Sequence, residues 1–175
     1  MKRWFAVVAA VVTAAVLPGT ASAAAPTPGY TFSNTMTTLH TGMCAAVGNN
    51  STSAGMHLIQ YRCDGKDNKR FHLLPAGTDK YFIKVKSSLG LSSHLCLAPK
   101  DDSRAQHALV VQSRCANSDF QVWETVSLGN DSYRVRNYAT GLCMTVAWDM
   151  RNSGQPLDQA SCGAFSAQAW RFTRV

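Results

Sequence analysis

The chain has 175 residues, with 17 lysines and arginines against 10 acidic residues and a net charge of +7. This basic excess is modest: it permits attraction to acidic glycans or membrane surfaces, but most such residues on a small domain are solvated. No pattern of basic and aromatic residues typical of RNA-binding domains accompanies it, so we expect no nucleic-acid partner.

The first 23 residues have the layout of a secretory signal peptide. Lys2 and Arg3 precede an uncharged apolar run, and small residues lead to an Ala-x-Ala cleavage site at 21–23. The alternative, a membrane anchor, needs about 20 apolar residues, whereas this run has about 14. We expect a secreted, extracellular chain of residues 24–175 without an integral membrane segment. Its net charge is +5, from 15 basic and 10 acidic residues; cleavage after Ala25 is a variant of this expectation.

Six cysteines lie in the expected mature chain, at three equal intervals of 19 positions. An even number of cysteines in an exported chain indicates disulfides, and six cysteines allow 15 pairings. Equal intervals favour the pairing in which each copy of a repeated unit closes its own bridge. The predicted bridges are Cys44–Cys63, Cys96–Cys115 and Cys143–Cys162.

Other residues recur at the same places in each copy. A glutamine lies three residues before each second cysteine, at Gln60, Gln112 and Gln159, and a large aromatic residue lies eight residues after it, at Phe71, Trp123 and Trp170. The chain therefore contains three repeats of about 50 residues. We place them at about 30–78, 79–130 and 131–175, after a short lead-in at 24–29.

The repeats have the pattern of β-structure. Segments 30–32, 81–85 and 133–135 open the three copies with β-branched and aromatic residues, and clusters of Gly, Asn, Asp and Ser separate them. No helical period of 12 or more residues follows the leader, which predicts an all-β domain. Since no single copy of this length buries a core alone, the three copies must pack around a common axis.

The sequence of the three repeats resembles the ricin B-type β-trefoil lectins, whose characteristic feature is one Gln-x-Trp motif per repeat. Residues 121–123 and 168–170 match the motif fully, and residues 69–71 form a degenerate copy that keeps an aromatic residue. The resemblance covers about 30–175 and implies a β-trefoil with pseudo-threefold symmetry. We interpret the motif residues as core rather than sugar contacts: Phe71, Gln121, Trp123, Gln168 and Trp170.

The resemblance also implies one sugar site per repeat, with an Asp two residues after the first cysteine, an aromatic residue near the second and an Asn before the motif glutamine. Here the Asp is replaced in all three copies, by Ala46, Ala98 and Thr145. The first copy keeps Tyr61 and Asn68, with Asn49 in its loop, and the third has Trp148 and Asp149. The second copy keeps neither partner. An aromatic ring for stacking and a carboxylate or amide for hydroxyl groups are what a sugar requires.

Two functions follow from this pattern. The first is a carbohydrate-binding module of weak affinity, without catalytic activity, whose partner is a glycan or glycoprotein. The second is a protein-binding trefoil that has lost its sugar residues, such as a toxin-like targeting subunit, an inhibitor or an adhesion piece. We expect no metal and no cofactor, because no ligand spacing or catalytic motif is present, and we expect a monomer.

Overall fold

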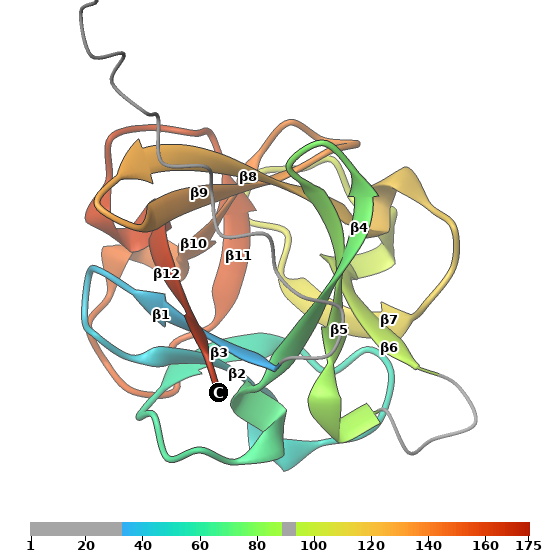
Figure 1. Ribbon diagram of the computed structural model, residues 1–175, viewed down its shortest axis with the longest axis horizontal. Coiled ribbons are helices and arrows are strands. Elements are labelled where there is room, and N and C mark those ends of the chain that lie inside the picture. Colours follow the sequence, from blue (N-terminus) through green and yellow to red (C-terminus); the bar gives the residue numbers. More distant parts are fainter. Residues whose placement is uncertain (1–32, 89–93) are drawn as a thin grey trace, which may run out of the picture.

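The computed structural model describes residues 33–88 and 94–175 (Figure 1). The predicted signal peptide, the lead-in and the expected strand at 30–32 lie outside the described residues. All regular strands and helices of the described part are short, and none of its helices has the length and apolar character to cross a membrane. The prediction of an all-β domain is confirmed.

Six of the twelve strands found within the described residues form a closed ring. Neighbours pair antiparallel in the order β1, β4, β5, β8, β9 and β12, and β12 pairs back with β1. Each repeat contributes two of these strands. Their bounds are β1 Asn34–Thr38, β4 Phe71–Gly77, β5 Lys80–Val85, β8 Val122–Gly129, β9 Ser132–Asn137 and β12 Ala169–Arg174.

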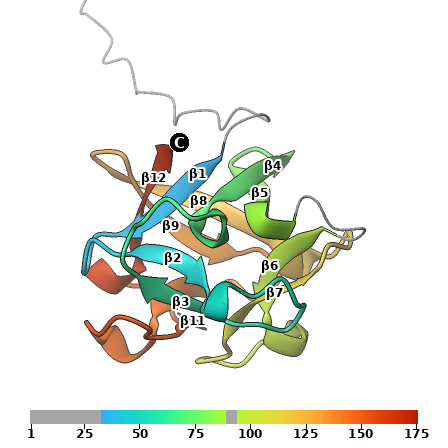
Figure 2. The same cartoon turned by 90° about the horizontal axis from the view of Figure 1, so that it is seen from below.

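The other six strands form three hairpins, one per repeat, on one side of the ring. Figure 2 shows β3, β7 and β11 gathered there, away from β4 and β12. The hairpins are β2 Cys44–Val47 with β3 Leu58–Tyr61, β6 Leu95–Pro99 with β7 Val110–Arg114, and β10 Cys143–Val146 with β11 Leu157–Ala160. A ring closed by three equivalent hairpins is the β-trefoil that the sequence predicts.

Each repeat closes its own disulfide, as the equal cysteine intervals predict. The bridges join Cys44 to Cys63, Cys96 to Cys115 and Cys143 to Cys162. A loop of about 20 residues closed in this way stabilises a fold by roughly 3 kcal/mol.

Short 3-10 helices occupy matched places in the repeats. One set follows the first strand of each hairpin: η1 Gly48–Asn50, η4 Lys100–Asp102 and η6 Ala147–Asp149. A second set precedes the last ring strand of each repeat: η2 Asp67–Lys69, η5 Asp119–Gln121 and η7 Ser166–Gln168. A further helix, η3 Lys86–Ser88, follows β5.

Three aromatic side chains, one per repeat, are fully buried in the core: Phe71, Trp123 and Trp170. The indole Nε1 of Trp123 donates to the carbonyl of Leu97 at 2.8 Å, and that of Trp170 donates to the carbonyl of Met144 at 3.1 Å. Each tryptophan thus buries a large apolar surface and leaves no polar atom unpaired.

The buried glutamines of the hairpins join neighbouring repeats. The Nε2 of Gln159 donates to the carbonyls of Ser103 and Ala105, in the loop of the second repeat. Gln60 makes the same two bonds to the loop of the third repeat, and Gln112 to the loop of the first. Because the bonds run cyclically, each loop is fixed against the hairpin of the following repeat.

Candidate functional site

The motif glutamines hold the turns that follow the hairpins. In the third repeat, Gln168 accepts from the backbone N–H of Gly163 at 2.9 Å and donates to the carbonyl of Ser161 at 2.9 Å. Gln121 makes the same pair of bonds around Cys115 in the second repeat. Each of these glutamines therefore holds the backbone on both sides of the second cysteine of its repeat with the two ends of its amide.

In the first repeat an ion pair replaces this bracket. Lys69 stands at the glutamine position, its side chain is 4% exposed, and its Nζ lies 2.8 Å from Asp64 Oδ1. Asp64 occupies the position of Ala116 and Gly163 in the other repeats. The bond from Lys69 holds the pKa of the Asp64 carboxyl below its ordinary value. Two positions therefore differ together in the first repeat: Lys69 replaces the motif glutamine, and Asp64 supplies the partner for its ammonium group.

We predict that Asp64→Ala lowers the melting temperature by several degrees, because it leaves the ammonium group of Lys69 buried without its charged partner. The double variant Asp64→Ala/Lys69→Gln recreates the arrangement of the second repeat and should regain most of the loss. Differential scanning calorimetry at neutral pH measures both changes. A double variant less stable than Asp64→Ala alone would contradict the matched pair.

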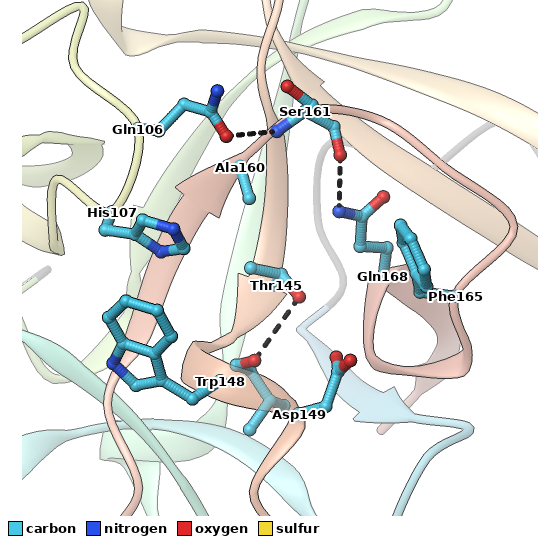
Figure 3. A pocket seen from close by; sticks show the side chains of 10 residues that line it. Gln106, His107, Thr145, Trp148, Asp149, Ala160, Ser161, Phe165 and Gln168 are labelled. Carbon is cyan, nitrogen blue, oxygen red and sulfur yellow. Dashed lines mark hydrogen bonds between the residues drawn. The ribbon is translucent and has the colours of Figure 1, made fainter.

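The third repeat contains a hollow of about 370 Å³, which we call the third-repeat hollow. It lies where the loop of the second repeat meets the hairpin of the third. Figure 3 shows His107 and Trp148 on one side, Phe165 on the other, and Thr145 and Ala160 between them. Asp149 and Gln168 also line it, together with Gln106, Val146 and Ser161.

Two of its aromatic side chains are unusually open to solvent. Trp148 is 70% exposed and Phe165 is 56% exposed. The phenyl ring of Phe165 lies directly over Gly163, where an added Cβ would come within 2.3 Å of a ring carbon. Exposed aromatic rings facing one hollow are typical of a binding surface.

The carboxylate of Asp149 makes no hydrogen bond or ion pair with any residue that the structure describes, and so it is free to accept ligand hydroxyl groups. Its backbone is fixed instead: His40 Nε2 donates to the Asp149 carbonyl at 2.8 Å. The hydroxyl of Ser166 lies 2.9 Å from the other ring nitrogen of His40. His40 therefore ties the first repeat to two helices beside the hollow, η6 and η7.

Trp148 has a backbone conformation that disfavours a bulky residue. Its φ is +57°, in the left-handed region, and the equivalent residues of the other repeats are Asn49 and Asp101, at +53° and +54°. Asn and Asp tolerate this region, whereas for a bulky side chain it is an outlier. The third repeat thus places a large ring where the other two have a short polar one.

His107 also has a left-handed backbone conformation and differs from the residues at the equivalent positions of the other repeats. Its φ is +64°, and the equivalent positions of the other repeats are Gly55 and Gly154, both at +87°. The imidazole stacks on the Trp148 indole, with ring centroids 4.2 Å apart and an angle of 16° between the planes.

A third residue that differs from its equivalents in the other repeats contacts His107. Asp158 is 1% exposed and occupies the position of Ile59 and Val111 in the other repeats. His107 Nδ1 donates to its Oδ2 at 2.9 Å, while Oδ1 has no partner among the described residues. Burial raises the pKa of the Asp158 carboxyl; the hydrogen bond from His107 opposes this, and the charge of Asp149 adds to it.

These three residues contact one another in series: Asp158 is hydrogen-bonded to His107, and His107 is stacked on Trp148. A residue held in the left-handed region costs about 1–3 kcal/mol, and an unsatisfied buried polar atom costs about 1–3 kcal/mol. The other two repeats show that the fold does not require any of the three residues. Destabilising features that cluster at one place, and that the fold does not require, indicate a functional site.

The first repeat contains a second hollow, of about 250 Å³, lined by the predicted residues Asn49, Tyr61 and Asn68. The structure thus brings the three candidates of the first copy together. Tyr61 is 37% exposed, but Asn68 is buried and its Nδ2 already donates to the carbonyl of Val47 at 2.9 Å. Arg62 and Lys66 also line this first-repeat hollow.

The predicted residues Trp148 and Asp149 likewise share one hollow, but the sequence prediction did not include His107, Asp158 or Phe165. Neither a motif nor a cysteine interval marks these residues. Aligning the three repeats column by column would have found two of them, since His107 stands in a glycine column and Asp158 in an apolar one. No group of three or more potential metal ligands occurs within residues 33–88 and 94–175.

The closed ring of strands and its three hairpins define the class of the ricin B-type β-trefoil domains. More specifically, a model of the family described as ricin-type beta-trefoil lectin domain-like matches residues 23–92 and 89–160, and the chain belongs to this family. A comparison with curated protein sequences gave no match.

Solved structures show the same fold. A designed threefold symmetric protein, ThreeFoil, is 26% identical, with a TM-score of 0.77 over 82% of this chain and 99% of that one. An exo-beta-1,3-galactanase from Clostridium thermocellum is 19% identical, with a TM-score of 0.77 over 83% of this chain but only 30% of the enzyme. A ricin B-like lectin from Macrolepiota procera, solved with lactose, is 13% identical, with a TM-score of 0.65 over 82% of this chain and 95% of the lectin.

Proposed function

We propose that this protein is a secreted carbohydrate-binding module without catalytic activity, and that it binds a neutral sugar in the third-repeat hollow. The observation that carries the proposal is the contact series Asp158–His107–Trp148, whose residues differ from those at the equivalent positions of the other repeats and which ends in an exposed indole ring. The apolar face of a pyranose stacks on such a ring, and the free carboxylate of Asp149 accepts hydrogen bonds from neighbouring hydroxyl groups.

The lining of the hollow supports this class of ligand. It includes no lysine or arginine, and its one carboxylate belongs to Asp149. An acidic sugar would meet repulsion there, whereas a neutral one would not. Glycoside hydrolysis uses two carboxyl groups, which favours binding over catalysis in this hollow. The lactose complex of the Macrolepiota procera lectin provides a first neutral sugar to test.

A glycan array probed with the secreted protein and with Trp148→Asn tests the proposal. Asn is the residue at this position in the first repeat, so the variant keeps a side chain that tolerates the backbone. We expect neutral glycans to bind the wild type and to lose at least about tenfold of their signal in the variant, since stacked aromatic residues are frequent hot spots. Asp101→Asn, at the matching position of the second repeat, is the control and should bind like the wild type.

An array without glycan signals for the wild type would refute the proposal. Capture of a protein partner that persists after removal of its glycans would then support the protein-binding alternative. Equal signals for the wild type and Trp148→Asn would place sugar binding outside this hollow.

We further predict that Gly163→Ala weakens glycan binding without unfolding the protein. An added Cβ would displace the phenyl ring of Phe165, which lies over this glycine. The fold tolerates alanine here, because Ala116 occupies this position in the second repeat. We expect a loss of about 2- to 10-fold in affinity with a melting temperature within a few degrees of wild type. Titration calorimetry with the strongest neutral glycan of the array measures it, and unchanged affinity would exclude Phe165 as a wall of the site.

The first-repeat hollow is a second candidate subsite. Arg62 and Lys66 at its rim favour an acidic sugar, since the nearby Lys69 and Asp64 neutralise each other. Array signals for acidic glycans that Tyr61→Ser removes and Trp148→Asn leaves intact would support this assignment. Loss of those signals in Trp148→Asn would oppose it.

Secretion is part of the proposal and rests on the leader pattern alone. The intact mass of the protein recovered from the culture medium of an exporting host should match residues 24–175, less six hydrogens for three disulfides. A mass that retains the leader would contradict cleavage at this site.

A further inference from the structure

We propose that His107 and Asp158 are positioning residues that hold the Trp148 indole in place as a preformed wall of the third-repeat hollow. The assignment rests on the proposed function for its purpose, but its geometry does not depend on any ligand. Two repeats contribute to this wall, because His107 belongs to the second repeat and Trp148 to the third.

The stack with His107 restrains the Trp148 indole. An indole that is 70% exposed would sample several rotamers in solution, because few neighbours surround it. The His107 ring covers one of its faces at a centroid distance of 4.2 Å and nearly parallel to it. The rest of the indole remains largely exposed to the solvent.

His107 itself is held by two hydrogen bonds. Its backbone N–H donates to the carbonyl of Gln159 at 2.7 Å, and its Nδ1 donates to Asp158 Oδ2 at 2.9 Å. Asp158 cannot swing away, because it lies on β11 with 1% exposure and its backbone bridges to Leu109 of the neighbouring repeat. The imidazole is therefore held at both its backbone and its ring.

Asp158 has no role in the core packing that the other repeats share, and its side chain bonds to His107. Its column in the repeats is apolar, its second oxygen is unpaired, and it does not line the hollow. A buried carboxylate of this kind destabilises a fold unless it serves a specific partner. The partner of Asp158 is His107, and the partner of His107 is Trp148.

Tryptophan fluorescence of the secreted protein tests the proposal without any sugar. Trp123 and Trp170 are fully buried, so acrylamide quenching of the mature chain reports on Trp148. His107→Gly, which restores the residue of the other two repeats, should raise the quenching constant by up to about twofold, since it uncovers one face of the indole. Asp158→Asn should raise it less, because an amide oxygen still accepts from His107.

The pH profile of the emission gives a readout that a purely structural role would not move. The groups that face the stack are His107, Asp158 and Asp149. Burial raises the pKa of the Asp158 carboxyl above its ordinary value, so its protonation changes the charge next to the stack. We expect a pH-dependent step in Trp148 emission above about pH 4 in the wild type. This step should be lost in Asp158→Asn, which removes the carboxyl, and reduced in His107→Gly, which separates it from the indole, while His94→Ala, at an exposed histidine elsewhere, keeps it.

The same variants on the glycan array then measure what positioning contributes to binding. Release of one immobilised side chain corresponds to a loss of about 2- to 12-fold in affinity. Quenching and pH profile unchanged in His107→Gly would overturn the assignment. So would a melting temperature that falls while both readouts stay at wild-type values. An altered fluorescence with a blank array would uphold the positioning role and reject the proposed sugar binding.

Discussion

Replacing Trp170 by alanine is expected to lower the free energy of unfolding by about 3–5 kcal/mol. The side chain is fully buried where the three repeats meet, and its removal opens a cavity and leaves the carbonyl of Met144 without its donor. For a domain with a net stability of about 5–15 kcal/mol, this loss is a large share. Urea unfolding followed by far-ultraviolet circular dichroism measures it.

Trp148→Ala is the matched control for this prediction. It removes the same side chain from a position that is 70% exposed, so the free energy of unfolding should change by no more than about 0.5 kcal/mol. Equal losses for the two variants would mean that Trp148 contributes to the core, contrary to the site described above.

Asp158→Val is expected to raise the free energy of unfolding by about 1–3 kcal/mol at neutral pH. The substitution restores the valine of the second repeat and removes a buried carboxylate with one unpaired oxygen. The gain should depend on pH in a defined direction. Burial raises the pKa of this carboxyl in the folded protein above its ordinary value of 3.8.

The sign of that dependence follows from proton binding. Where the folded state binds more protons than the unfolded state, stability falls as the pH rises. In the wild type the contribution of Asp158 is therefore most favourable below about pH 4 and is lost as the pH rises through its raised pKa. The advantage of Asp158→Val should be small in acid and grow toward neutrality.

Thermal unfolding of both proteins between pH 3 and 7 checks this prediction. The reciprocal change Ile59→Asp is the control, since it places a carboxylate in the first repeat where Gly154 stands in place of a histidine. It should destabilise the fold. An Asp158→Val protein that melts lower than the wild type at neutral pH would show that the carboxylate stabilises the domain, and the functional explanation for it would fail.

The fold was largely predictable from the sequence because the repeat encodes it three times. The cysteine intervals, Gln60 and its equivalents, and the aromatic column at Phe71 follow from contacts that every repeat must make around the axis. A signal repeated at fixed spacing is visible without the structure. The pairing of the three disulfides and the all-β class were accordingly predicted correctly.

The site was predictable only in part, because it depends on what the repeats do not share. Trp148 and Asp149 stood out as an aromatic residue beside a carboxylate within one loop. His107 lies 41 positions earlier in the chain, in another repeat, and reaches Trp148 only because Gln159 fixes the loop of the second repeat against the hairpin of the third. Contacts across repeats of this kind follow from the packing of the three units, which motif spacing does not describe.

We expect that His107, Trp148 and Asp158 lower the stability of the domain and are needed for binding, and a single variant can test both effects together. His107→Gly/Trp148→Asn/Asp158→Val replaces each of these residues with one that occupies the equivalent position of another repeat. Thermal unfolding and the glycan array should be measured on the same preparation of this variant and of the wild type. We expect a melting temperature equal to or above that of the wild type together with loss of neutral-glycan binding. A variant that melts several degrees lower and still binds those glycans would contradict it.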